Sequence, residues 1–204
     1  MSKGLRRPKE PPRAWQRMLS GRRLDLIDPS PLDIEIEDIA HGLARVARWN
    51  GQTAGAAIFS VAQHSVLVSD IFAVQDPAAD RATRLMVLLH DAPEYVIGDM
   101  ISPFKAVIGE SYKDVEARLL SAIHLRFGLP PVTPLAVKAA TKQADKVAAF
   151  LEATHLAGFG IEESCRIFGD PRPFPPTMES LTLDPQPAEE AKTAFLARFA
   201  DLFR

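Results

Sequence analysis

Cysteine, long apolar runs and excess charge are all scarce in this sequence. A single cysteine, Cys165, occurs among 204 residues, so no disulfide can form within the chain and a reducing cytoplasm is the expected compartment. No apolar run approaches the roughly 20 residues of a membrane-spanning helix, and the polar, basic beginning lacks the apolar segment of a signal peptide. The net charge of -2 gives no sign of a protein that binds nucleic acid or membranes. We therefore expect a cytoplasmic protein that binds neither nucleic acid nor membranes.

Proline is common, with 17 residues, but much of it lies in two clusters. Residues 1–14 combine prolines with five basic side chains, one acid and almost nothing apolar, which predicts a disordered basic arm. A nucleic-acid-binding arm is the alternative to a merely solvated one. Residues 170–187 are also rich in proline, and we expect a loop there. The chain over 15–204 has the length and apolar content of a single domain.

Apolar residues outside these clusters recur with helical spacing. Ser60 and Gln63 have the spacing of a capping box, which predicts the start of a helix. Asp76 followed by Pro77 predicts another start, with aspartate as the cap. The expected helices span about 37–50, 60–75, 76–98, 111–127, 133–158 and 188–203. Residues 24–36 alternate in polarity and allow a short strand or an extended segment, so the predicted fold class is all-α.

Two histidines and two aspartates stand out in these apolar helices. His90 and Asp91 end an apolar run, where burying them is costly unless something compensates. His64 lies early in the preceding helix, and Asp145 interrupts a later apolar helix. Two imidazoles and two carboxylates would neutralise a divalent cation and leave coordination positions open, as catalytic metal sites do. Such a set accepts Mn, Fe, Co, Ni or Zn, and the other three histidines are expected to be structural.

The order His, His-Asp, Asp resembles the HD-domain phosphohydrolase superfamily. Four blocks carry the resemblance in sequence order: residues 61–65, 89–94, 98–99 and 142–145. The second and third blocks are most similar to the bacterial 5′-deoxynucleotidase branch, and the resemblance covers about residues 37–160. It implies a single helical bundle of about six to seven helices. It also implies a homodimer or a higher homo-oligomer.

The resemblance further implies a role for particular residues. The metal ligands would be His64, His90, Asp91 and Asp145. Acidic residues beside the metal would serve catalysis, namely Glu94 and Asp99. Contacts to phosphate and sugar would come from Arg48 and Trp49. Apart from the resemblance, we expect Lys105 to help Arg48 neutralise the phosphate.

The residues themselves support these roles but also allow plainer ones. Glu94 lies four residues after His90 and would share its helix face, but it could be a surface acid. Arg48 has a planar guanidinium suited to phosphate, but it could be a charge at a helix C-terminus. Trp49 offers a flat wall for a sugar or base, but it could belong to the core.

These features predict a metal-dependent phosphohydrolase that removes the 5′-phosphate from (deoxy)nucleoside monophosphates. Few basic residues surround the expected phosphate position, which favours monophosphates, and the ring of Trp49 favours deoxyribose over ribose. One alternative is a deoxynucleoside triphosphate triphosphohydrolase on the same core. The other is a non-catalytic module that binds metal or nucleotide in signalling.

Overall fold

Helices make up most of the regular structure of this chain, as its apolar spacing predicts. The computed structural model describes residues 13–101, 107, 110–175, 181 and 183–204. Within these residues there are eight α-helices, two short 3-10 helices and one two-stranded sheet, so the all-α fold class is confirmed. Residues 1–12 of the expected basic arm, and also Lys105, lie outside the described residues.

In the described residues, the strands and 3-10 helices lie before residue 52, and all the α-helices except α1 follow them. The antiparallel strands are β1 (Trp15–Arg17) and β2 (Arg23–Asp25), and the 3-10 helices are η1 (Pro31–Asp33) and η2 (Arg48–Gly51). The first four α-helices are α1 (Ile36–Leu43), α2 (Val61–Gln75), α3 (Arg81–Leu88) and α4 (Glu94–Ile97). The others are α6 (Glu110–Arg126), α7 (Leu135–His155), α8 (Ile161–Phe168) and α10 (Ala188–Phe203).

Helix α2 begins where its capping box predicts. The Ser60 hydroxyl accepts a hydrogen bond from the Gln63 amide at 3.3 Å, and the Gln63 side chain accepts one from the Ser60 amide. These two bonds satisfy amides that a helix start leaves unpaired. The cap therefore fixes His64 in the first turn of α2. Helices α6, α7 and α10 also match their predicted spans closely.

The single helix predicted over 76–98 is wrong, because the chain forms α3 and α4 with a turn between them. Asp80, rather than Asp76, caps α3 by accepting a hydrogen bond from the amide of Thr83 at 2.7 Å. The proline at 93 has no amide hydrogen and disfavours a helical residue before it, so a continuous helix cannot pass. His90 and Asp91 therefore lie in a turn, and Glu94 does not share a helix face with His90.

Helix α1 is shorter than predicted, because it ends at Leu43 instead of near residue 50. The chain then runs in an extended conformation beside the start of α2, with the amide of Arg48 donating to the Phe59 carbonyl at 2.9 Å. Trp49 and Asn50 follow with φ of 56° and 51°, in the left-handed region that bulky residues rarely adopt. Arg48 is thus no helix C-terminal charge; it is held close to α2.

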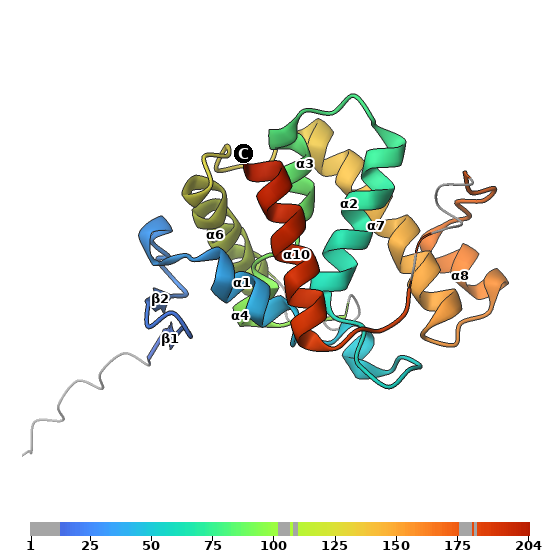
Figure 1. Ribbon diagram of the computed structural model, residues 1–204, viewed down its shortest axis with the longest axis horizontal. Coiled ribbons are helices and arrows are strands. Elements are labelled where there is room, and N and C mark those ends of the chain that lie inside the picture. Colours follow the sequence, from blue (N-terminus) through green and yellow to red (C-terminus); the bar gives the residue numbers. More distant parts are fainter. Residues whose placement is uncertain (1–12, 102–106, 108–109, 176–180, 182) are drawn as a thin grey trace, which may run out of the picture.

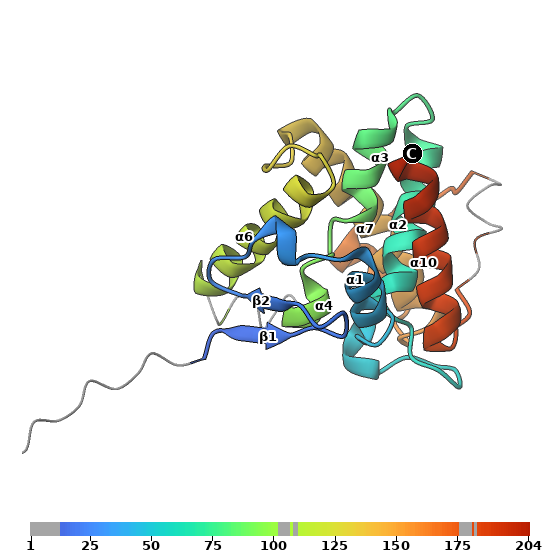
Figure 2. The ribbon, with the colours of Figure 1, turned by 60° about the vertical axis from the view of Figure 1, so that its left-hand side comes forward.

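Helix α2 lies at the centre of the molecule and packs against α3, α7 and α10, while α8 packs on the outer side of α7 (Figure 1). Helix α8 was not predicted from the sequence. Figure 2 shows the hairpin of β1 and β2 at one edge of the helical body. None of the helices in the described ranges combines the length and apolar composition needed to span a membrane. The N-terminus of α2, the turn after α3 and the middle of α7 meet beside this core.

Candidate metal centre

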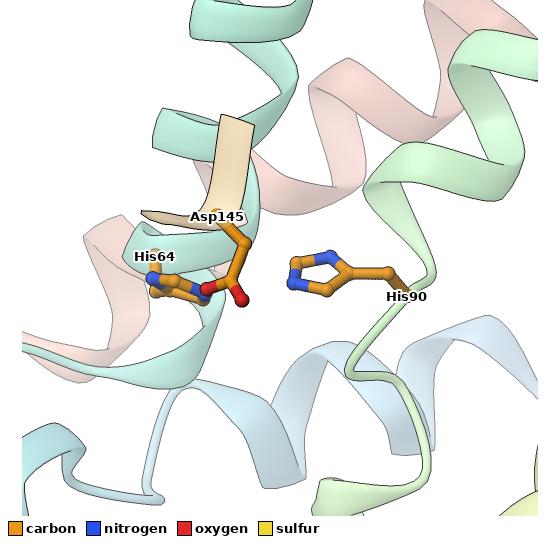
Figure 3. Close-up of side chains that lie close together, drawn as sticks. All are labelled: His64, His90 and Asp145. Atoms are coloured by element: carbon orange, nitrogen blue, oxygen red, sulfur yellow. The ribbon is translucent and has the colours of Figure 1, made fainter. Parts of the chain in front are cut away.

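Three side chains from distant parts of the chain converge beside α2 (Figure 3). His64 comes from the first turn of α2, His90 from the turn after α3, and Asp145 from the middle of α7, and their potential ligand atoms all lie within 4.8 Å of one another. Asp91 joins them, since its Oδ2 is 3.4 Å from Nε2 of His64 and 3.3 Å from Nε2 of His90. The structure therefore brings together all four predicted metal ligands.

The hydrogen bonds of the two imidazoles leave one nitrogen of each ring for a metal. Nδ1 of His64 lies 2.5 Å from Oε1 of Glu152, and Nδ1 of His90 lies 2.8 Å from the carbonyl oxygen of Val87. Each Nδ1 faces an acceptor and so carries the hydrogen, which leaves Nε2 with its lone pair when the ring is neutral. Both Nε2 atoms are buried without a hydrogen-bond partner among the described residues. This arrangement fits a divalent cation, whose histidine ligands usually make a second hydrogen bond of this kind.

The charges of the cluster show how strongly it favours a cation. Burial and the nearby Arg48 act to lower the pKa of His64, but Glu152 and Asp91 more than offset them and raise that pKa to about 10. Burial acts to raise the pKa of Asp91, yet His90 and His64 hold it well below its usual range. The metal-free cluster therefore retains a positive charge as a proton on His64. A metal ion would supply that charge instead and would require neutral His64.

Glu152 connects the metal cluster to the rest of the site, and it was not identified as a site residue from the sequence. Its side chain is fully buried and accepts hydrogen bonds from His64 Nδ1, from Trp49 Nε1 at 2.8 Å and from Arg48 Nε at 3.3 Å. Burial acts to raise the pKa of Glu152, but His64 and Arg48 lower it to about 2. One sequence signal was available: Glu152 lies two helical turns after Asp145, in an otherwise apolar stretch.

Arg48 is enclosed by carboxylates. Besides its contact with Glu152, its Nη1 lies 3.0 Å from Oδ2 of Asp99, and only 14% of its side chain is exposed. Burial acts to lower the pKa of Arg48, but Glu152 and Asp99 raise it above its ordinary value. The guanidinium is therefore charged at any ordinary pH, and two neighbouring carboxylates offset that charge.

A cavity of about 590 Å³ opens beside the metal cluster, a size typical of small-molecule sites. Its acidic lining consists of Asp91, Glu94, Asp99 and Asp145. Its apolar wall includes Trp49, Phe159, Ile167 and Phe168. The ring centre of Trp49 lies 5.5 Å from that of Phe159 and 6.0 Å from that of Phe168. The structure thus places Glu94, Asp99, Arg48 and Trp49 around one cavity, as expected.

Two basic residues of the cavity, Lys142 and Lys146, were also not identified as site residues from the sequence. The same holds for the apolar wall formed by α8 and the segment before it. Lys142 and Lys146 lie four residues apart, or about one helical turn, and flank Asp145, which is a signal that the sequence contains. The aromatic wall has no such signal, because it depends on how α8 packs against α7.

The chain has extensive similarity to two proteins, whereas no protein-family profile matches it. It is 57% identical over 192 residues to the uncharacterized protein RCAP_rcc00048 of Rhodobacter capsulatus, a match that covers 94% of this chain and 97% of that protein. It is 31% identical over 170 residues to the uncharacterized protein YfdR of Escherichia coli K12, covering 83% and 85% respectively. Both matches extend over most of the domain.

Proposed function

The chain belongs to the same family as YfdR and RCAP_rcc00048, and we propose that it is a metal-dependent phosphohydrolase that removes the 5′-phosphate from (deoxy)nucleoside monophosphates. One observation carries the proposal. Two buried imidazole Nε2 atoms without hydrogen-bond partners among the described residues face two carboxylates, and those carboxylates line an open cavity. In an octahedral ion, four protein ligands leave coordination positions for water and substrate. Their order along the chain resembles that of the HD-domain phosphohydrolases.

The ligand set favours one divalent transition metal, either Mn, Fe, Co, Ni or Zn. When bound, such an ion would polarise a phosphoryl oxygen and lower the pKa of a water molecule. His64, His90, Asp91 and Asp145 would hold it. Glu152 would keep the proton of His64 on Nδ1, so that Nε2 stays available.

Glu94 is the residue to which we assign proton transfer. It is the first residue of α4, its side chain is buried, and it lines the cavity with Asp91. Asp99 also lines the cavity, but its carboxylate is paired with Arg48 at 3.0 Å. This ion pair already engages the Asp99 carboxylate, whose side chain is only 7% exposed. We therefore assign Asp99 to the ion pair with Arg48, which holds both side chains in place.

The apolar wall is suited to a nucleoside. Trp49, Phe159 and Phe168 give the cavity flat aromatic surfaces on which a sugar or base can pack. The same cavity is also lined by carboxylates, two of which, Asp91 and Asp145, are proposed metal ligands. A phosphate bound beside the metal would thus have its nucleoside directed toward this wall.

A triphosphohydrolase on the same site is the second candidate. The expectation of a monophosphate rested on a scarcity of basic residues near the phosphate, yet Lys142 and Lys146 both line the cavity. Two additional cations favour a substrate with more negative charge. The choice between the two activities depends on which phosphate bond is cleaved.

The test is a phosphate-release assay on chelator-treated protein reloaded with one metal at a time, using dAMP, AMP and dATP. We expect release of phosphate from dAMP and loss of this activity in His64→Ala. His155→Ala is the matched control, since His155 is an exposed histidine outside the cluster. The absence of hydrolysis with every metal and nucleotide would refute the proposal, and release of triphosphate from dATP in preference to phosphate from dAMP would establish the second candidate.

A further inference from the structure

The cations around the cavity differ in what they are bound to. Arg48 contacts Asp99 at 3.0 Å and Glu152 at 3.3 Å. A guanidinium held between two carboxylates gives little net positive charge to a ligand. Lys142 and Lys146, by contrast, are exposed, lie four residues apart on α7 and line the cavity. They are the cations that the cavity can offer to an anionic substrate.

The charge of the site shows why these lysines are needed. Four carboxylates line the cavity, and that of Glu152 lies directly behind Trp49 and Arg48. A divalent cation and Arg48 together offset three of these five negative charges. A phosphate dianion entering such a site would still meet net negative surroundings. Lys142 and Lys146 supply the two remaining positive charges.

Lys142 contacts one of the proposed metal ligands, Asp145. Its Nζ lies 2.9 Å from Oδ2 of Asp145, while 66% of its side chain remains exposed. An ammonium group has three donors, so this contact leaves donors for a phosphate oxygen beside the metal. Lys146 makes no ion pair within the described part of the chain and lies one residue beyond Asp145.

We infer that Lys142 and Lys146 bind the phosphate of the substrate, whereas Arg48 positions Asp99 and Glu152. This inference rests on the proposed phosphohydrolase function and assigns its phosphate contacts to residues of α7. It replaces the expectation from the sequence that Arg48 is the main phosphate contact.

The test compares Lys142→Gln, Lys146→Gln and the double variant with the wild-type protein, all loaded with the same metal. Lys138→Gln is the matched control, because Lys138 is exposed one turn earlier on α7 and does not line the cavity. Titration calorimetry with inorganic phosphate measures binding without turnover. Metal content and the KM and kcat for dAMP are measured in parallel.

We expect each single substitution to weaken phosphate binding and raise KM by about tenfold, as for the loss of a charge-assisted hydrogen bond. The double variant should lose about a hundredfold, with unchanged metal content and a normal Lys138→Gln control. Wild-type phosphate affinity in the double variant would overturn the inference, and so would an equal loss in Lys138→Gln. Lysine-dependent phosphate binding in a protein that hydrolyses no nucleotide would support the inference while refuting the proposed function.

Discussion

Glu152→Gln tests how far one buried carboxylate organises the site. In the wild type, one oxygen of Glu152 faces Nδ1 of His64, and the other accepts hydrogen bonds from Trp49 and Arg48. Glutamine has the same size, but it offers one acceptor oxygen and one amide donor. Whichever way the amide turns, either His64 or the pair of Trp49 and Arg48 faces a donor in place of an acceptor.

Each orientation has a defined cost. An unpaired buried donor costs about 1–3 kcal/mol, and removal of one partner from a buried ion pair costs about 3–5 kcal/mol. We expect the free energy of unfolding to fall by about 2–4 kcal/mol, between these two costs. If the amide donates to Nδ1 of His64, the ring proton moves to Nε2 and blocks the metal. Metal affinity should therefore fall by about 10–100-fold, the usual effect of losing such a supporting contact.

Urea unfolding of the metal-free protein and metal titration of the folded protein measure these two effects separately. Glu163→Gln is the matched control, because it removes the same charge from an exposed position on α8. Metal affinity equal to that of the wild type in Glu152→Gln would show that Glu152 does not determine which nitrogen of His64 carries the proton.

Four further predictions follow from the same geometry. Asp145→Asn should lower metal content in the purified protein by tenfold or more, since it removes a charged ligand; full occupancy would contradict its assignment. Glu94→Gln should retain the metal and lower kcat for dAMP by about 10²-fold, and near-normal turnover would exclude proton transfer by Glu94. Trp49→Ala should lower the ratio of the hydrolysis rates of dAMP and AMP. Equal rates on dAMP and AMP in the wild type would contradict the role given to Trp49. In the metal-free protein, Glu152, with its pKa lowered to about 2 from 4.5, stabilises the fold above pH 4.5 and loses this effect as the pH falls toward 2. His64, with its pKa raised to about 10 from 6.5, stabilises the fold below pH 6.5 and loses this effect as the pH rises toward 10. The Tm of the metal-free protein should therefore decline both below pH 4.5 and above pH 6.5. A Tm that rises from pH 6.5 to 10 would contradict this.

Local signals in the sequence predicted the parts of the fold that depend on neighbouring residues. The capping box at Ser60 defined the start of α2, and the spacing of apolar residues predicted α7 and α10. The break before Pro93 was equally local, but the apolar run on both sides of it favoured one continuous helix. The turn that carries His90 and Asp91 therefore went unpredicted.

Contacts between distant segments could not be predicted in this way. The pairing of Arg48 with Glu152 joins residues 104 positions apart, and nothing in the sequence around either one indicates its partner. The aromatic wall likewise depends on α8, a short helix whose packing on α7 brings Phe168 to Trp49. Individual candidate residues could therefore be proposed from the sequence, whereas their ion pairs could be seen only in the structure.

The origin of the metal ligands in three separate segments also affects how the chain folds. The unfolded chain does not hold α2, the turn after α3 and α7 together, so only the folded domain presents His64, His90 and Asp145 as one group. A bound ion would act as a removable cross-link between these segments and would favour the folded state by mass action. Chelation would then remove both the proposed catalytic ion and a cross-link between the helices. Activity and resistance to unfolding would therefore depend on the same ion.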